Sequence, residues 1–369
     1  QQMGPLKAHL DQFRRVHPDD TVVNELRTAV FDLQILIGPL INQFTFEQEM
    51  RSKKVLLADT NKKQQVIAKM ALGGTGVILD IVNSAEEGKA KLSGGSYDLL
   101  IFDAPCVELA NVVADLSKPI ETVLMTSDEI PSYLPALKSL KVMPQIVSRN
   151  ELDRTFTVKN ITTTITKLLS EDFFGLEKYL SWGVEVNTLP ITSSKGRPEI
   201  IANVLGYFEK LGIRRANRDR MQVVLEEMLM NAIYDAPTDQ NGKSKYNHLD
   251  RTVDFSLKAE EQGMVRFASD GVLAAVSVQD PFGSLNGSTI LKYLDANYGG
   301  GVQDLNRKEG KGGAGRGLHQ IVENSDLVVF NVEPKVKTEV IALFNIEVKE
   351  AIDRHPSFHL FFKINRAST

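Results

Sequence analysis

The stretch RKEGKGGAGRGLHQIVENSD, Arg307 to Asp326, concentrates glycine and positive charge directly before an apolar helical pattern. Five glycines lie between Gly310 and Gly317, and Lys311 and Arg316 lie among them. Glycine-rich segments that present backbone amides at the start of a helix are typical of phosphate-binding loops. The fold of the carboxyl-terminal part therefore depends on which kind of phosphate loop this is.

Three common phosphate loops are excluded by the sequence around the glycines. Gly310, Gly312 and Gly315 fit GxGxxG, but the dinucleotide-binding fingerprint needs a strand before it, and NYGGGVQDLNRKE is polar. A Walker motif requires Ser or Thr after Gly-Lys, and Gly312 follows Lys311. A protein-kinase glycine loop is excluded because the chain has no HRD or DFG motif.

The composition is that of an ordinary globular protein. Its 369 residues predict roughly two to three domains, and 42% are hydrophobic and 24% charged. The net charge of −4 gives no reason to expect nucleic acid as a partner. A single cysteine, Cys106, excludes a disulfide framework and indicates a cytoplasmic location. No apolar run approaches the roughly 20 residues of a membrane span, so we expect no membrane insertion.

Residues 1–50 predict a helical segment. From residue 21 onward, apolar residues recur at helical spacing, which leaves one side of a helix that must be covered. The segment either packs on its own domain or forms the seam of a homodimer, and both alternatives stay open.

Residues 53–150 predict a parallel sheet with helices on both faces, because five short apolar runs alternate with helical stretches. The runs are KVLLAD (54–59), TGVILDI (75–81), YDLLIFD (97–103), ETVLMTS (121–127) and PQIVSR (144–149). In such sheets chemistry lies beyond the carboxyl ends of the strands. Asp59, Asp103, Thr126 and Arg149 all fall there.

This segment resembles the receiver domain of two-component systems. The resemblance places Asp103 at the phospho-acceptor position, Thr126 at the hydroxyl position and Asp59 at the first of two acidic positions. Thr60 occupies the second acidic position, and Arg149 stands where a lysine is expected. Mg²⁺ prefers about two carboxylates, and a guanidinium does not replace an ammonium, so we favour a degenerate pseudo-receiver over a working one.

Residues 151–183 predict a helical connector, and residues 184–350 predict an α+β domain with helices on one face of a mixed sheet. Strands are expected at 184–193, 251–258, 264–270, 272–279, 327–332 and 338–346, and helices at 196–212, 217–234, 287–296 and 315–324. The tail 351–369 contains RHPSFHLFFKIN (354–365), whose apolar and aromatic residues favour an added strand over a partner-docking segment.

Two further patterns in this domain carry polar groups suited to a nucleotide. In VVLEEMLMNAIYDAP, Glu227 and Asn231 are four residues apart and so lie on one side of a helix. Asn231 offers a carbonyl oxygen to Mg²⁺, and Glu227 is a candidate general base. In VSVQDPFGSL, Asp280 ends an apolar strand and can accept a hydrogen bond from an exocyclic amine, with Gly283 three residues on.

The order of these motifs, with GAGRGL at the end, resembles the GHKL ATPase superfamily, which includes gyrase, MutL, histidine kinases and anti-sigma serine kinases. The resemblance covers about 185–348 and implies a left-handed, Bergerat-type ATP fold with a mobile lid. It implies that Asn231 holds Mg²⁺ and Asp280 the adenine amine. The candidate nucleotide-binding residues are Asn231, Asp235, Asp280, Gly283, Lys311, Gly313, Gly315, Arg316, Gly317 and Leu318, with Glu227 as the catalytic residue.

One departure from the family pattern qualifies the resemblance. The family's Asp-x-Gly-x-Gly box is altered here, because its first glycine comes one residue late and Ser284 and Leu285 follow. A glutamate at the Glu227 position is typical of the serine-kinase and gyrase branches rather than of histidine kinases. NELRTAV (24–30) is similar to the histidine-kinase phospho-acceptor box, but Asn24 replaces the histidine, so it is either a relic or a coincidence.

These patterns lead to two hypotheses. The first is a signal-transduction protein that binds Mg-ATP and phosphorylates an unidentified signalling partner in trans, under control of the receiver-like segment. The second is a nucleotide-switched binding or scaffold protein with little or no phosphotransfer.

Overall fold

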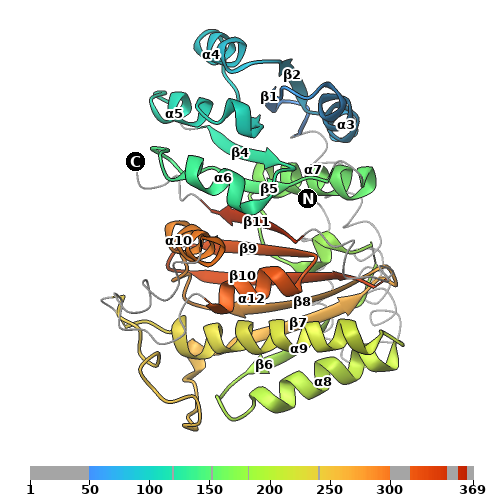
Figure 1. Ribbon diagram of the computed structural model, residues 1–369, viewed down its shortest axis with the longest axis vertical. Coiled ribbons are helices and arrows are strands. Elements are labelled where there is room, and N and C mark those ends of the chain that lie inside the picture. Colours follow the sequence, from blue (N-terminus) through green and yellow to red (C-terminus); the bar gives the residue numbers. More distant parts are fainter. Residues whose placement is uncertain are drawn as a thin grey trace, which may run out of the picture.

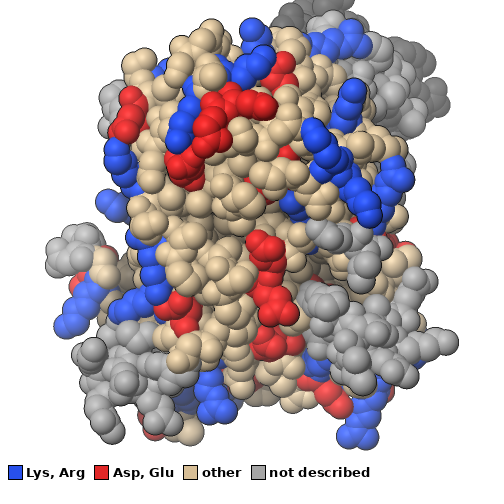
Figure 2. Space-filling model, turned by 45° about the horizontal axis from the view of Figure 1, so that its top comes forward, with Lys and Arg blue, Asp and Glu red and all other residues tan. Residues whose placement is uncertain are grey.

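The computed structural model describes residues 50–118, 120–150, 153–181, 183–239, 242–299, 316–346 and 356–363. Its described strands form one sheet of 11 strands in the order β2-β1-β3-β4-β5-β11-β9-β10-β8-β7-β6 (Figure 1). Helices lie on both faces of this sheet. Acidic and basic side chains are interspersed on the face seen in Figure 2.

The first five strands are parallel and have the order 2-1-3-4-5, which is the flavodoxin-like order shared by receiver domains. We call this part the receiver-like unit. Its strands are β1 (Lys54–Ala58), β2 (Ile78–Val82), β3 (Leu99–Phe102), β4 (Glu121–Thr126) and β5 (Gln145–Ser148). Its helices are α3 (Lys62–Gly73), α4 (Ala85–Gly94), α5 (Leu109–Ala114) and α6 (Ile130–Leu137), and α7 (Arg154–Leu169) follows β5.

Local sequence explains where several of these helices begin. The side chain of Asn61 accepts hydrogen bonds from the first amides of α3, Ser84 does so for α4, and Asp153 for α7. The residues of β3 and β4 are all buried, because helices cover both faces of the parallel sheet. The parallel sheet expected from the five apolar runs is therefore confirmed.

The remaining sheet is mainly antiparallel and forms what we call the carboxyl-terminal unit. Its strands are β6 (Asn187–Ile191), β7 (Gly263–Ser269), β8 (Leu273–Asp280), β9 (Leu327–Glu333) and β10 (Lys337–Asn345). Its helices are α8 (Arg197–Lys210), α9 (Arg215–Met230), α10 (Gly287–Tyr298) and α12 (Arg316–Asn324). Figure 1 shows these four helices on the same face of the sheet.

One predicted strand of this unit is wrong. Residues 251–258 contribute only an isolated bridge, between Ser193 and Ser256. The hydroxyl of Ser194 accepts a hydrogen bond from the Phe255 amide at 2.9 Å and donates to the Val253 carbonyl at 3.1 Å. A side chain thus bonds the backbone groups that a strand ladder would have used.

The strand β11 (Ser357–Phe362) joins the two units into one sheet. It runs parallel to β9 from Ser357 to Phe362, and its other edge pairs with β5, where Leu360 lies opposite Ile146. The amide of Gln145 reinforces this second contact: its Nε2 donates to the Phe362 carbonyl at 2.8 Å, and its Oε1 accepts from the Phe362 N–H at 2.7 Å. The added strand predicted within 354–365 is therefore confirmed.

The sheet has two differently covered faces. The front face is the one covered by α4, α5, α6, α8, α9, α10 and α12. The back face is the one covered by α3, α7 and the segment 173–180. Successive strand residues point to alternate faces, so each strand contributes to both cores. The connector predicted at 151–183 supplies α7 and part of this back layer.

Candidate functional site

The carboxyl ends of the parallel strands bring together Asp59, Asp103, Thr126 and Arg149, as expected, and all four are buried. Asp59 follows β1 and forms an ion pair with the guanidinium of Arg149, which follows β5. The Asp59 carboxylate also accepts a hydrogen bond from the Asn61 amide at 2.8 Å. The positive charge at this edge is therefore already paired with the carboxylate that a metal would need.

The carboxylate of Asp103 is occupied by groups of the chain itself. Its Oδ2 accepts hydrogen bonds from the amide and the hydroxyl of Thr60, at 2.7 and 2.6 Å, and its Oδ1 accepts from the Cys106 amide at 3.2 Å. Asp103 is only 3% exposed. Burial and the nearby Asp103 raise the pKa of the Cys106 thiol to about 12, so this thiol stays protonated.

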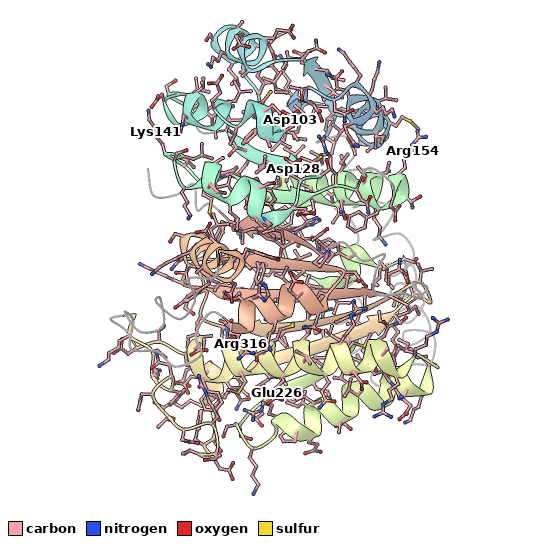
Figure 3. The ribbon with its side chains drawn as sticks, viewed as in Figure 1. Asp103, Asp128, Lys141, Arg154, Glu226 and Arg316 are labelled. Carbon is pink, nitrogen blue, oxygen red and sulfur yellow. The ribbon has the colours of Figure 1, made fainter. Side chains whose placement is uncertain are left out.

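The hydroxyl of Thr126 also has an internal partner, because it accepts a hydrogen bond from the Asp128 amide at 3.0 Å. Asp103 and Asp128, labelled in Figure 3, follow the carboxyl ends of the neighbouring strands β3 and β4. The arrangement is a closed polar cluster in which Thr60 bonds the residue at the phospho-acceptor position.

In the carboxyl-terminal unit, the candidate residues lie around the end of α9. The helix ends at Met230, and Asn231–Asp235 continue as a π-helical turn in which the Ala236 amide donates to the Asn231 carbonyl at 2.8 Å. π-Helical turns are rare in proteins, and those that occur are often found at functional sites. Asn231, which is partly exposed, therefore stands where the helical pattern changes.

The two adjacent glutamates of α9 point in different directions. Glu226 forms an ion pair with Arg197 of α8, with 3.0 Å between Oε1 and Nε. Glu227 instead faces α12: a Cβ atom added to Gly317 would lie 2.4 Å from Glu227 Oε2. Gly317 thus leaves the space that this carboxylate occupies. The structure brings Glu227 and the end of the glycine-rich stretch into contact.

The electrostatic surroundings of Glu227 raise the pKa of its carboxyl group. Burial is the largest cause, followed by the negative charges of Glu226 and Asp235, while Arg251 and Arg316 lower it. Figure 3 labels Arg316 at the start of α12, close to α9. A raised pKa is the property that a carboxylate needs to act as a base near neutral pH.

Arg251 is a residue of this site that the sequence did not predict. Its Nη2 lies 3.6 Å from Asp235 Oδ1, and its guanidinium lies over the ring of Tyr234, 4.3 Å from the ring centroid. It comes from the segment 251–258 that was predicted to be a strand, and nothing in that segment's pattern indicates a site residue.

Asp280 ends β8 on the front face. Its Oδ1 accepts a hydrogen bond from the Phe282 amide at 3.0 Å. Burial raises the pKa of this carboxyl to about 6, although the Phe282 and Gly283 amides and the nearby Thr338 hydroxyl lower it. Asp280 is therefore ionised at neutral pH but close to its titration range.

Thr338 is a second residue that the sequence did not reveal. It lies directly opposite Asp280 on β10 and is 2% exposed. Its hydroxyl lies close enough to the Asp280 carboxylate to lower the pKa of that group, and it has no other hydrogen-bond partner among the described residues. A buried hydroxyl with no partner besides a partly exposed carboxylate indicates a place for a polar ligand. Only the strand register reveals this pairing.

Gly283 has φ of +56°, and a Cβ there would lie 2.1 Å from the Glu333 carbonyl oxygen and 2.8 Å from the Lys335 amide nitrogen. Its packing against the β9–β10 turn is sufficient to require glycine at this position. Leu318 is buried in the front core. The predicted residues Lys311, Gly313 and Gly315, and the segment 1–49 with Asn24, lie outside the described residues.

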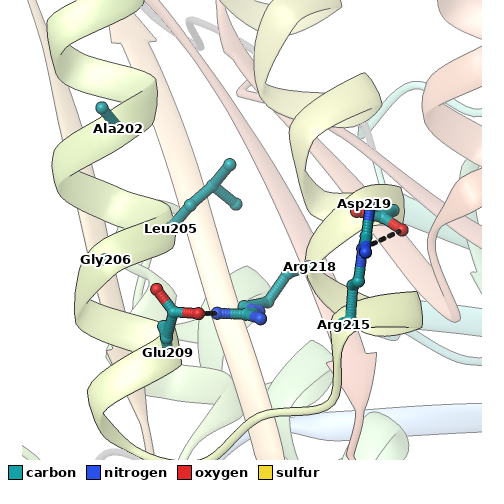
Figure 4. Close-up of a pocket in the computed structure, with 7 residues that line it drawn as sticks. All are labelled: Ala202, Leu205, Gly206, Glu209, Arg215, Arg218 and Asp219. Atoms are coloured by element: carbon teal, nitrogen blue, oxygen red, sulfur yellow. Dashed lines mark ion pairs between the residues drawn. The ribbon is translucent and has the colours of Figure 1, made fainter.

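A hollow of about 240 Å³ lies away from this site, between α8 and α9 (Figure 4). Its lining consists of Ala202, Leu205, Gly206, Glu209, Arg215, Arg218 and Asp219. Glu209 pairs with Arg218, and Arg215 lies 3.7 Å from Asp219. It contains none of the predicted site residues, and its charged groups are paired with one another.

Among the described residues, no three His, Cys, Asp or Glu side chains come together as a metal site, and no helix could cross a membrane. The donors suited to a magnesium ion that arrives with a nucleotide are the oxygen of Asn231 and the phosphates themselves. The partly exposed Asn231 amide at the end of α9 fits that role.

No protein-family model and no curated protein sequence matches the chain. Solved structures match in part. The response regulator TrrA of Thermotoga maritima, in complex with Mg²⁺ and BeF, is 26% identical over 21% of this chain and 70% of that chain, with a TM-score of 0.20. A chemotaxis response regulator of Vibrio cholerae is 17% identical over 31% of this chain and 98% of that one, with a TM-score of 0.27.

The signal receiver domain of an HD domain-containing protein from Pseudomonas fluorescens is 14% identical over 32% of this chain and 95% of that chain, with a TM-score of 0.29. The receiver-like fold rests on the parallel strand order 2-1-3-4-5 and on the polar residues at the strand ends. The chain is thus similar to receiver domains in its first unit.

Proposed function

We propose that the carboxyl-terminal unit binds Mg-ATP and transfers the γ-phosphoryl group to a partner protein in signal transduction. The receiver-like unit regulates this transfer as a pseudo-receiver. The observation that carries the proposal is the contact between Glu227 and Gly317. It sets a carboxylate with a raised pKa against the first turn of a helix that a glycine-rich stretch precedes.

Each part of Mg-ATP has a suitable group in this unit. The Asp280 carboxylate accepts a hydrogen bond from the exocyclic amine of adenine, and the Thr338 hydroxyl beside that carboxylate bonds the ring. The Asn231 oxygen holds Mg²⁺, which neutralises phosphate charge when it is bound. The first amides of α12 and the Arg316 guanidinium face the phosphates.

The chemistry assigned to Glu227 is proton removal. Its carboxylate takes the proton of the attacking hydroxyl as the bond from that oxygen to the γ-phosphorus forms. The bond from the γ-phosphorus to the bridging oxygen breaks, and ADP leaves with the electron pair. Apart from this proton transfer, the chain's residues act by positioning and by stabilising charge.

Membership of the GHKL superfamily is part of this proposal. The order of the three motifs supports it, as does an antiparallel sheet with α8, α9, α10 and α12 on one face. The glutamate at position 227 favours the serine-kinase and gyrase branches of that superfamily.

The closed cluster around Asp103 favours a second candidate function, a nucleotide-switched binding protein without phosphotransfer. In that case the receiver-like unit is a docking platform. Mg-ATP binding without turnover, accompanied by a nucleotide-dependent change in mass in light scattering, selects this function over the first.

Transfer of label from γ-labelled ATP, to a partner protein or to water, tests the role of Glu227. Glu227→Gln should lower turnover about 100-fold or more, because the general base is lost, and should leave ATP affinity nearly unchanged. Gly317→Ala should lower turnover about tenfold and change the free energy of unfolding by less than about 1 kcal/mol, since it displaces only the end of a flexible side chain.

The matched control is Glu226→Gln, which removes the neighbouring carboxylate that pairs with Arg197. It should retain most of the turnover. Turnover that persists in Glu227→Gln at the wild-type rate contradicts the role of Glu227.

A further inference from the structure

A row of three polar side chains, two of them fully buried, crosses the back face of the carboxyl-terminal unit. Gln279 on β8, Glu339 on β10 and Asn331 on β9 lie directly opposite one another. The Glu339 carboxylate accepts hydrogen bonds from Gln279 Nε2 at 2.9 Å and from Asn331 Nδ2 at 3.1 Å. Glu339 and Asn331 are fully buried. In this back-face row, the buried carboxyl group of Glu339 is therefore hydrogen-bonded to the side-chain amides on both neighbouring strands.

The row is tied to the connector that follows the receiver-like unit. Lys167 of α7 is fully buried, and its Nζ donates to Asn331 Oδ1 at 2.6 Å and to the Tyr179 hydroxyl at 3.0 Å. The same Nζ lies 3.7 Å from the ring centroid of Phe361 on β11, and complete burial holds the pKa of Lys167 well below its usual value. The amide of Gly175 donates to Glu339 Oε2 at 2.7 Å. Three hydrogen bonds thus converge on Glu339, one of them from the connector.

The front-face neighbours of this row are the two residues assigned to adenine. Asp280 follows Gln279 in β8, and Thr338 precedes Glu339 in β10. They are opposite each other, as Gln279 and Glu339 are. Adjacent strand residues share a peptide plane and point to opposite faces. The position of each front side chain is therefore fixed by the bonds of its neighbour on the back face.

We propose that Glu339 and Gln279 are positioning residues for the base-recognition pair Asp280 and Thr338. Lys167 and Gly175 connect this pair to the receiver-like unit. The inference rests on the proposed nucleotide site, because it concerns how that site distinguishes bases. It assigns to the back-face row a role in specificity and in communication between the units, beyond support of the core.

The base contact makes this role measurable. Asp280 accepts a hydrogen bond from the amino group of adenine, whereas guanine presents a carbonyl oxygen at that ring position and offers no donor there. Misplacement of the Asp280 carboxylate should reduce the preference for ATP over GTP. General damage to the fold should weaken the binding of ATP and GTP by the same factor.

The test compares Gln279→Leu with Ser277→Ala in the full chain by calorimetric titration of Mg-ATP and Mg-GTP. Gln279 is partly exposed, so its replacement leaves the buried Lys167 and Glu339 in place. Ser277 lies on the same strand and face, and its hydroxyl has no partner among the described residues. The ratio of the two affinities should fall about fivefold in Gln279→Leu, the effect of losing one hydrogen bond, and stay unchanged in Ser277→Ala.

Hydrogen exchange of the peptide that contains Gly175 gives a second readout. Mg-ATP should slow exchange of this peptide in the wild type, and the slowing should be lost in Gln279→Leu while ATP still binds. An unchanged affinity ratio in Gln279→Leu overturns the inference and leaves the proposed function intact. A wild-type protein that binds neither nucleotide overturns the proposed function, and the inference with it.

Discussion

At the scale of single residues, the carboxylates of the carboxyl-terminal unit differ in what surrounds them. Asp280 is partly exposed and lies opposite the Thr338 hydroxyl, and the pKa of its carboxyl group is raised to about 6. Glu227 is half-buried beside Gly317, and the negative charges around it also raise its pKa. The first is suited to accepting a hydrogen bond from a base, and the second to accepting a proton.

The raised pKa of Asp280 predicts a pH dependence of nucleotide affinity. Its carboxyl group is ionised above pH 6 and becomes protonated below it, so the acceptor is lost as the pH falls. Between pH 7.5 and pH 5 the affinity for Mg-ATP should therefore decrease about tenfold.

Asp280→Asn is the control, because it keeps an acceptor oxygen that does not titrate. Protonation of the nucleotide affects both proteins equally, so the difference between their titration curves reports Asp280. Parallel curves for the two proteins would contradict the assignment of Asp280 to the base.

The residues that the sequence revealed are those whose partners are local. Glu227 and Asn231 are visible because helical spacing puts them on one side, and Asp280 because it ends an apolar strand. Thr338 and Arg251 were missed, since each meets its neighbours only through strand register or loop packing. The sequence likewise does not show that the adjacent residues Glu226 and Glu227 face different helices, α8 and α12.

At the scale of elements, the receiver-like unit holds its charges in two ways, one at the strand ends and one between a helix end and a loop. Asp59 and Arg149 form a buried pair, whereas Asp115 and Lys141 form an exposed pair at 2.7 Å. Removal of one partner of a buried pair leaves an uncompensated charge in the core, while exposed pairs are screened by water. The two pairs therefore give a matched comparison.

Arg149→Met should lower the free energy of unfolding by about 3–5 kcal/mol, since Asp59 stays buried without its partner. Lys141→Met should change it by about 1 kcal/mol or less. Urea denaturation of the two variants measures both effects. A cost for Arg149→Met as small as that for Lys141→Met would show that the Asp59 pair contributes little to this closed cluster.

Among the elements, short apolar runs predicted all five parallel strands, because both faces of the central strands are buried and the edge strand β2 is partly buried. The antiparallel strands from β7 to β10 were also predicted from apolar residues. The strand predicted at 251–258 was wrong because the Ser194 side chain bonds the backbone of this segment. A side chain 59 to 61 residues away in the sequence leaves no local pattern. The π-helical turn at Asn231 was likewise invisible, since its residues continue the helical spacing.

At the scale of the whole molecule, β11 makes one sheet out of two units. The sequence indicated a strand in 354–365 but not its neighbours, because pairing between β11, β5 and β9 joins parts of the chain that are far apart. Gln145 bonds both backbone groups of Phe362, and the Tyr133 and Phe358 rings stack with centroids 6.2 Å apart. The units should therefore unfold together.

Truncation after residue 355 removes β11 and should uncouple the units. Differential scanning calorimetry should show one transition for the full chain and two for the truncated protein, with the lower one shifted down. Gln145→Ala, which removes only the side-chain contribution, should keep a single transition at a slightly lower temperature. A single unchanged transition after truncation would mean that β11 does not link the units.

The central claim is that the carboxyl-terminal unit is a Mg-ATP site built around Asn231. Its most direct measurement is a calorimetric titration of ATP into the wild type, once with Mg²⁺ and once with EDTA. The same titration is made with Asn231→Ala and with the control Asn324→Ala, which changes the end of α12 that lies farthest along the helix from Gly317. The account predicts wild-type binding that weakens about tenfold or more in EDTA and in Asn231→Ala, and no change in Asn324→Ala. No binding by the wild type, or equal affinity with and without Mg²⁺, would contradict it.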